Sequence, residues 1–105
     1  MKLPNIGQDL AELETPTLLI DLDLFESNIR QLYSFCRDNG KAWRPHSKAN
    51  KSPEIAHLLV DHGAIGITCA KLSEAELMVE HGSQSVLLAN QIVSPGKFAT
   101  LAQLQ

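Results

Sequence analysis

Short apolar runs alternate along this chain with stretches whose apolar residues recur at helical spacing. The run 17–23 follows Pro16 and predicts a strand. After it, apolar residues recur at steps of three and four, which predicts a helix with one apolar face. These are Phe25, Ile29, Leu32, Tyr33 and Cys36. Asn39-Gly40 ends the stretch with two residues that tolerate a left-handed helix cap.

Three further strand-plus-helix units follow this first pair. The runs 42–48, 65–69 and 85–89 predict strands that begin about 20 residues apart, a spacing typical of such units. The predicted helix starts are Ser52-Pro53, Ser73 with Glu76 as a capping box, and Ser94-Pro95. The pattern therefore predicts an α/β fold with parallel strands.

Two of the units end alike. Residues 58–63 read Leu-Leu-Val-Asp-His-Gly, and residues 77–82 read Leu-Met-Val-Glu-His-Gly. We expect both to be the last turn of a helix, with His62 and His81 in structural positions where a helix dipole favours a cation. Asp21 and Asp23 precede the first helix, and we interpret them as capping or turn residues rather than as a carboxylate pair.

The chain divides into an N-terminal arm, 1–15, and a partial barrel domain, 16–105, with a lead-in strand and three units. Parallel strands need helices over both faces, and a closed barrel takes eight units and about 250 residues. The last apolar stripe continues to Gln105 without a stop signal. We therefore expect a fragment or truncated product of something longer, with weak or no activity alone.

Composition narrows the class of protein. Hydrophobic residues make up 44% and charged residues 20% of the chain, which is ordinary for a globular protein, and the net charge of −3 gives no case for nucleic acid or an anionic membrane. No apolar run approaches the ~20 residues of a membrane span, and the start lacks a secretion signal, so we expect a cytoplasmic protein. Cys36 and Cys69 fit buried reduced thiols.

The segment 42–51 carries the most chemistry. Side chains alternate along a strand, so Arg44, His46 and Lys48 share one face. Such a face is either an exposed edge strand guarded by charge or a basic floor for an anionic ligand at the carboxyl end of the strand. Neighbouring positive charge favours the neutral amine of a lysine, and a neutral amine can form a Schiff base with an aldehyde.

The same segment resembles a known family. Arg44-Pro45-His46-Ser47-Lys48 is similar to the R-P-H-x-K strand of the D-threonine aldolase and D-serine dehydratase family, and Lys48-Ala49-Asn50 to the K-A-N of alanine racemases. Asn50 stands where the family often has histidine, which leaves the substrate open. Further matches, in the family's order, are residues 15–23, Asn28-Ile29, 51–56, 66–70, 74–76 and 89–93, with Pro95 and Lys97.

The resemblance implies a fold-type III enzyme: the N-terminal portion of an alanine-racemase-like (β/α)8 TIM barrel, incomplete in this chain. It implies pyridoxal 5'-phosphate as cofactor, with Lys48 as the catalytic Schiff-base lysine, and we expect His46 and Arg44 to bind the cofactor as well. It implies a lyase for D-β-hydroxy amino acids, a homodimeric full-length form, and a divalent metal held by residues outside this chain. Within the chain we expect no metal ligands.

Three alternatives stay open at this point: a truncated non-catalytic chain, an amino-acid racemase, and a cofactor-homeostasis protein built as a single barrel. Asn90 and Gln91 leave a predicted strand at its carboxyl end, where they could face the cofactor. Pro95-Gly96-Lys97 reads as a helix start rather than a phosphate loop, because the glycine and hydroxyl positions of that motif are missing.

Overall fold

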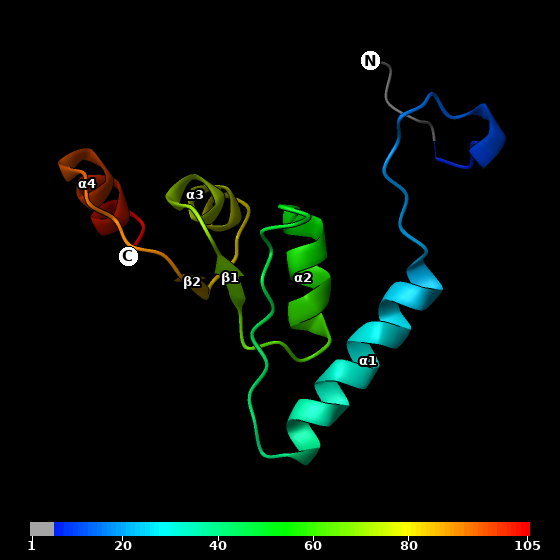
Figure 1. Ribbon diagram of the computed structural model, residues 1–105, viewed down its shortest axis with the longest axis horizontal. Helices are drawn as coiled ribbons and strands as arrows, with labels where there is room; N and C mark the ends of the chain where they lie inside the picture. The colour runs from blue at the N-terminus through cyan, green and yellow to red at the C-terminus, as the bar shows by residue number, and fades with distance from the viewer. Residues whose placement is uncertain (1–5) are drawn as a thin grey trace.

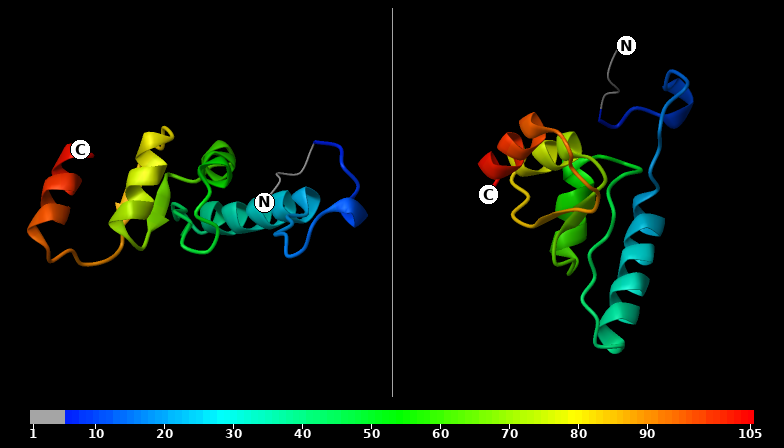
Figure 2. Two further views of the ribbon diagram at one scale, coloured as in Figure 1. Left: turned by 90° about the horizontal axis from the view of Figure 1, so that it is seen from above. Right: turned by 60° about the vertical axis from the view of Figure 1, so that its left-hand side comes forward.

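The computed structural model describes residues 6–105 and has an α/β architecture (Figure 1). The element order is a 3-10 turn, Leu10–Glu12, then α1 (Leu22–Asp38), α2 (Pro53–Asp61), β1 (Ile67–Cys69), α3 (Leu72–Glu80), β2 (Val86–Leu88) and α4 (Pro95–Gln103). The four helices follow one another across a flat molecule of 48 × 41 × 20 Å (Figure 2). The predicted alternation of strands and helices is confirmed for the units built on β1 and β2.

The two strands are parallel neighbours, with Ile67 opposite Val86 and Cys69 opposite Leu88. The extended segment 42–48 lies along the other edge of β1. Its bonds to the β1 region run from Ile65 N to Trp43 O (2.9 Å), from Thr68 N to Pro45 O (2.8 Å) and from Ser47 N to Thr68 O (2.9 Å). Three parallel extended segments therefore lie side by side in the order 42–48, β1, β2. We call these three segments the rows.

The prediction of a regular strand over 42–48 is wrong, because the row forms a single bridge, between His46 and Thr68. The bond from Ile65 N to Trp43 O would belong to a second bridge, between Arg44 and Ile65, whose other bond needs an N–H at residue 45. Pro45 has none, so the parallel ladder stops there.

The prediction of a strand over 17–23 is also wrong. Residues 17–20 are extended but have no strand beside them in the described part of the chain, and α1 already begins at Leu22. Leu18 is 84% exposed and Leu19 is 56% exposed. The predicted cap is confirmed, since the Asp21 carboxylate accepts the N–H of Leu24 at 3.0 Å.

Of the predicted N-terminal arm 1–15, the first five residues lie outside the described residues. The remainder contains the 3-10 turn, with Asp9 accepting the Ala11 N–H at 2.8 Å. No residue of that turn is buried.

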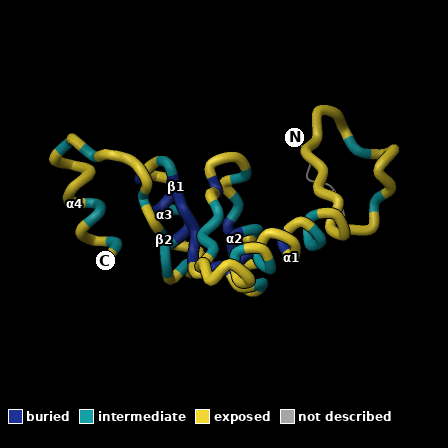
Figure 3. The backbone as a smooth tube through the Cα atoms, turned by 60° about the horizontal axis from the view of Figure 1, so that its bottom comes forward, coloured by how far each residue is buried: buried dark blue, intermediate teal, exposed yellow. Residues whose placement is uncertain are grey.

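The hydrophobic core lies between β1, α2 and α3 (Figure 3). Its buried members are Ile29, Ala56, Leu59, Ala64, Ile67, Cys69, Ala75 and Met78. Ile29 is the buried residue that α1 contributes to this core, and Phe25 of the same helix packs against it half-buried. The core therefore fixes the rows around β1 more firmly than either end of the chain.

The repeated helix ends are confirmed in structure. α2 and α3 each end in a histidine cap followed by a left-handed glycine. The Nδ1 of His62 lies 2.7 Å from Leu58 O, and that of His81 lies 2.9 Å from Leu77 O. Each histidine ring thus lies within hydrogen-bond distance of a carbonyl in the last turn of its helix, which is the structural role expected of both residues.

The start of α3 differs from the expected capping box. Ser73 and Glu76 do not form it, because the helix begins one residue before Ser73, at Leu72. Glu74 takes the third helical position, and its carboxylate accepts the Lys71 N–H at 3.2 Å. The Ser52 cap of α2 is confirmed by the bond from Ile55 N to Ser52 Oγ at 3.3 Å.

Candidate functional site

Lys48 is the last residue of the segment 42–48 and begins a tight turn at the carboxyl end of the three parallel segments. The bond from Lys51 N to Ser47 O, 2.8 Å long, closes this turn. Lys48 is exposed, and its ammonium makes no hydrogen bond or ion pair with any residue between 6 and 105. The backbone of the lysine is therefore held in place while its amine stays available.

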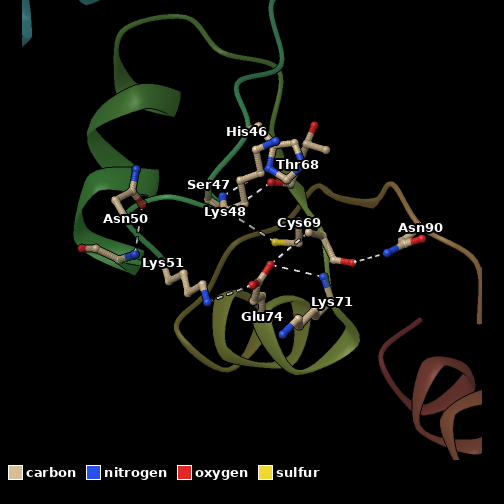
Figure 4. Close-up of polar contacts among 12 residues, drawn as sticks. His46, Ser47, Lys48, Asn50, Lys51, Thr68, Cys69, Lys71, Glu74 and Asn90 are labelled. Atoms are coloured by element: carbon tan, nitrogen blue, oxygen red, sulfur yellow. Dashed lines mark hydrogen bonds and ion pairs between the residues drawn. The ribbon is translucent and has the colours of Figure 1, made fainter.

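Ser47 holds the base of that turn. It is 1% exposed, and its Oγ donates to Thr68 O at 3.1 Å and lies 3.5 Å from Cys69 Sγ (Figure 4). Its N–H and C=O are both bonded as well, to Thr68 O and Lys51 N. With every polar group satisfied, Ser47 fixes where the Lys48 backbone leaves the row. The sequence analysis gave Ser47 no role.

His46 is exposed and bonded to the turn. The Lys48 N–H donates to His46 Nδ1 at 3.2 Å, so Nδ1 is the accepting nitrogen of this ring. In the neutral imidazole the proton then sits on Nε2. The His46 ring thus lies against the Lys48 backbone, and its Nε2–H has no hydrogen-bond partner among residues 6–105.

Arg44, which was expected to share a face with Lys48 and to bind the cofactor, lies apart from Lys48. Its guanidinium donates to Ser85 O at 3.1 Å, to Ser85 Oγ at 2.9 Å and, at 3.5 Å, to Ile67 O. Ser85 precedes β2, so Arg44 lies at the amino ends of the strands, whereas Lys48 follows the carboxyl end of its row. The alternation of side chains along a strand predicts the face on which a side chain lies, but not how far along the sheet a long side chain extends.

Gly66 makes room for this arginine. A Cβ at Gly66 would overlap the Arg44 guanidinium and the Ser85 carbonyl, and its φ of 144° is one that side chains rarely adopt. Arg44 therefore ties the row 42–48 to β2 across β1, and it acts here as a structural residue.

Glu74 is a buried acid that sequence reasoning missed. It is 7% exposed, and one oxygen, Oε2, accepts the N–H groups of Ala70 (2.9 Å) and Lys71 (3.2 Å). The other, Oε1, lies 3.4 Å from Lys51 Nζ. Burial pushes the pKa of Glu74 up, but the two N–H groups and the Lys51 ammonium outweigh it, so the pKa is lowered from its ordinary 4.5. Its position as third residue of a helix was the available sequence signal.

Cys69 ends β1 beneath the same turn. It is buried and free, and burial raises the pKa of its thiol, an effect that the Ser47 hydroxyl partly offsets and the Glu74 charge reinforces. Cys36 is a free, half-buried thiol. Both thiols are free, as expected, but the expected burial is confirmed for Cys69 alone, because Cys36 is half-buried.

Asn90 follows β2 at the carboxyl end of the rows. Its side-chain nitrogen donates to Ala70 O at 3.3 Å, and its side-chain oxygen accepts the Gln91 N–H at 3.0 Å. A pocket between α3 and α4 is lined by Ala70, Asn90 and Gln91, among other residues. Asn90 thus bridges the ends of β1 and β2 next to a hollow, whereas its predicted contact with a cofactor stays a prediction.

Two wider properties follow from the described residues. Among residues 6–105 no group of three or more histidine, cysteine, aspartate or glutamate side chains could hold a metal ion. Within the same residues no helix combines the length and apolar character that crossing a membrane requires.

Comparison with known proteins places the chain in a family. The family model described as alanine racemase, N-terminal domain, matches residues 20–105. The chain is 44% identical over 98 residues to a D-threonine aldolase from Arthrobacter sp, and 37% identical over 99 residues to a 3-hydroxy-D-aspartate aldolase from Paracoccus denitrificans. Each match covers 93% of this chain and 26% of the relative.

Solved structures agree with the sequence relatives. The D-threonine aldolase from Filomicrobium marinum matches with a TM-score of 0.88 at 43% identity, over 90% of this chain and 26% of that one. The D-threo-3-hydroxyaspartate dehydratase from Delftia sp. HT23 matches with a TM-score of 0.84 at 36% identity, over 92% and 26%. The chain thus spans about a quarter of these proteins, and it matches the N-terminal barrel part of D-threonine aldolase. The predicted fold class and the resemblance to lyases are both confirmed, and the chain belongs to the alanine racemase N-terminal domain family.

Proposed function

We propose that Lys48 binds pyridoxal phosphate through its amine, in a lyase that acts on D-β-hydroxy amino acids. The observation that carries this proposal is the turn 47–51, which holds the Lys48 backbone rigidly and leaves the amine unbonded among the described residues. The named relatives are aldolases and dehydratases, and their family depends on pyridoxal phosphate.

The residues of this chain fit such a cofactor. A primary amine at the carboxyl end of parallel rows is suited to an aldehyde, and the Nε2–H of His46 offers a hydrogen bond beside it. When bound, pyridoxal phosphate supplies an electron sink for bond cleavage. Arg44 takes no part in this proposal, because its guanidinium is bonded at the opposite end of the rows.

Lys48 has a different task in each candidate reaction. In a dehydratase its amine, once free of the cofactor, takes the α-proton of the substrate. In an aldolase the proton that leaves is on the β-hydroxyl, and the base is another group. D-threonine and D-serine as substrates therefore distinguish the two reactions.

Three further properties complete the proposal: a divalent metal bound by residues outside this chain, a homodimer, and a cytoplasmic location. Chelation with EDTA tests the first, and we expect it to abolish turnover while cofactor capture by Lys48 persists. Light scattering of the protein as its gene encodes it tests the second, and cell fractionation the third. Turnover that is unchanged by chelation would exclude the metal. A monomer would exclude the homodimer, and recovery outside the cytoplasm would exclude the cytoplasmic location.

Chemical trapping tests the lysine directly. The protein is incubated with pyridoxal phosphate, reduced with borohydride, digested and mapped by mass spectrometry. We expect the label on Lys48, no label there in Lys48→Ala, and normal labelling in Lys41→Ala, a matched exposed lysine away from the turn. Labelling that survives in Lys48→Ala on the same scale would exclude the assigned lysine.

Substrate specificity is tested on the protein as its gene encodes it. D-threonine should give glycine and acetaldehyde if the protein is an aldolase, and D-serine should give pyruvate and ammonia if it is a dehydratase. The L-isomers serve as controls and should be inert. Racemisation of alanine would favour the hypothesis of an amino-acid racemase. A labelled lysine with no turnover would favour the hypothesis of a cofactor-homeostasis protein.

A further inference from the structure

Two loops meet at the carboxyl end of the rows, and one carboxylate joins them. The first is the turn 47–51, which contains Lys48, and the second is the pair Ala70-Lys71 between β1 and α3. Figure 4 shows Lys51 and Glu74 pointing toward each other across the gap between these loops. The turn is thus tied to a segment more than 20 residues away in the sequence.

Glu74 is anchored firmly on its own side. Its Oε2 accepts two backbone N–H groups, at 2.9 and 3.2 Å, and the residue is 7% exposed. The bond to Ala70 N also ends the parallel ladder, because that N–H would otherwise be available to pair with the row 42–48. A carboxylate held by three partners has little freedom to move.

Lys51 is the other half of the tie, and its backbone depends on being held. Its φ of 51° is left-handed, a conformation that non-glycine residues adopt at a cost. Two contacts restrain it: its N–H donates to Ser47 O at 2.8 Å, and its Nζ lies 3.4 Å from Glu74 Oε1. Loss of the second contact leaves the turn to its own hydrogen bonds, from Lys51 N to Ser47 O, from Lys48 N to His46 Nδ1 and from Ser52 N to Asn50 Oδ1.

We propose that Glu74 is a positioning residue for Lys48: through Lys51 it holds the turn 47–51 in the shape that aims the Lys48 amine. The inference rests on the proposed function of Lys48 and adds to it a buried residue that makes no contact with the amine. A cap confined to α3 would need the two backbone N–H groups alone, and the bond to Lys51 is what exceeds that role.

The test uses variants that separate the two roles of Glu74. Glu74→Gln keeps an oxygen for the backbone N–H groups and loses the charge, and Lys51→Met removes the ammonium but keeps the stem. Lys51→Arg restores the charge, and Glu80→Gln, an exposed acid on the same helix, is the matched control. Three measurements follow: amide hydrogen exchange at 48–52 without cofactor, the apparent Kd for pyridoxal phosphate, and the urea midpoint.

We expect Lys51→Met to raise amide exchange at 48–52 and the cofactor Kd by about threefold to fivefold. Loss of a half-exposed ion pair changes an equilibrium constant by about this factor. Glu74→Gln should match it, the double variant should add nothing, and Lys51→Arg should restore both values. The urea midpoint of Lys51→Met should fall only by what this one ion pair contributes, and exchange within β1 should rise less than exchange at 48–52.

Two results would overturn the inference. One is unchanged exchange at 48–52 in Lys51→Met, and the other is a rise that spreads equally over β1 and α3, which would make Glu74 a cap alone. Wild-type protein that fails to label at Lys48 would instead refute the proposed function, and it would do so whatever the exchange at 48–52 shows.

Discussion

Cys69 stands directly under the Lys48 turn, 3.5 Å from Ser47 Oγ, and is fully buried. A thiol in that position is a small apolar side chain with a weak polar contact rather than a nucleophile. Burial raises the pKa of Cys69, and the nearby Glu74 charge raises it further, so less of it is thiolate at any given pH.

We expect Cys69 to resist alkylation. With iodoacetamide at pH 8, half-buried Cys36 should react several-fold faster than Cys69, since a thiolate and access are both needed. Peptide mapping over time measures the two rates. In concentrated urea the two cysteines should become equal, and equal rates in native buffer would show that the environment of Cys69 is open.

The sequence predicted some residues of the candidate site and missed others for a physical reason. Lys48 and His46 were predicted because basic residues recur at every second position of the segment 44–48. Glu74 was not predicted as a site residue because its partner Lys51 is far from it in the sequence, so no local pattern joins the two residues. Arg44 was placed with Lys48 because alternation gives a face, whereas its long side chain reaches back to Ser85.

The start of α3 depends on an ionised side chain. Glu74 binds Ala70 N and Lys71 N as an acceptor and Lys51 as an anion, and these contacts lower its pKa below 4.5 against the effect of burial. Such a group stabilises the folded state fully above the unfolded pKa, and the stabilisation is lost as pH falls through the folded pKa.

Acid titration should therefore separate Glu74→Gln from wild type. At pH 7 we expect the variant to be less stable in urea unfolding. The difference should begin to shrink below pH 4.5 and disappear as Glu74 itself is protonated. Glu80→Gln should follow wild type throughout. A stability difference that stayed constant down to low pH would mean that the charge of Glu74 contributes nothing.

Packing of α1 on the end of α2 depends on a glycine. Gly63 has a φ of 106°, and a Cβ there would overlap the Tyr33 ring of α1. We expect Gly63→Ala to destabilise the protein by about 1–3 kcal/mol, from backbone strain and overpacking together. Urea unfolding measures the change.

Gly82→Ala is the matched control for that substitution. Gly82 follows α3 in the equivalent position, with a φ of 90°, but nothing lies within 4 Å of its Cβ position. It should incur the backbone strain alone, so its loss of stability should be the smaller of the two. Equal losses would show that Tyr33 moves aside and that contact with the ring does not fix α1.

The helices and the apolar strands β1 and β2 were predictable from the sequence, whereas the strands expected at 17–23 and 42–48 were wrong. The rows 65–69 and 85–89 are apolar and carry no proline, and each contains a strand. In 42–48 the proline that interrupts the ladder was visible, but its effect depends on which residue of β1 stands opposite. Periodicity cannot show that residues 17–20 have no strand partner among residues 6–105, because a strand forms only by pairing with another strand.

The molecule as a whole is wider than its length predicts. Its radius of gyration is 16.4 Å, whereas a compact domain of this size has about 13 Å. Large apolar side chains are exposed at both ends of the chain, among them Leu18, Phe35, Val93 and Phe98. The hydrophobic core around β1 stabilises the middle of the molecule, and the outer helices α1 and α4 contribute few buried side chains to it.

We therefore expect the 105-residue chain, purified alone, to self-associate. Exposed apolar surface on 17–20 and α1 is the driving force, so multi-angle light scattering should give a mass that rises with concentration. Replacing Leu18 and Phe35 with serine should reduce the association and leave the urea midpoint near wild type, because both side chains already face water. A mass of one chain at every concentration would mean that these apolar residues fold back onto the core in solution, and the described arrangement of α1 would then be wrong.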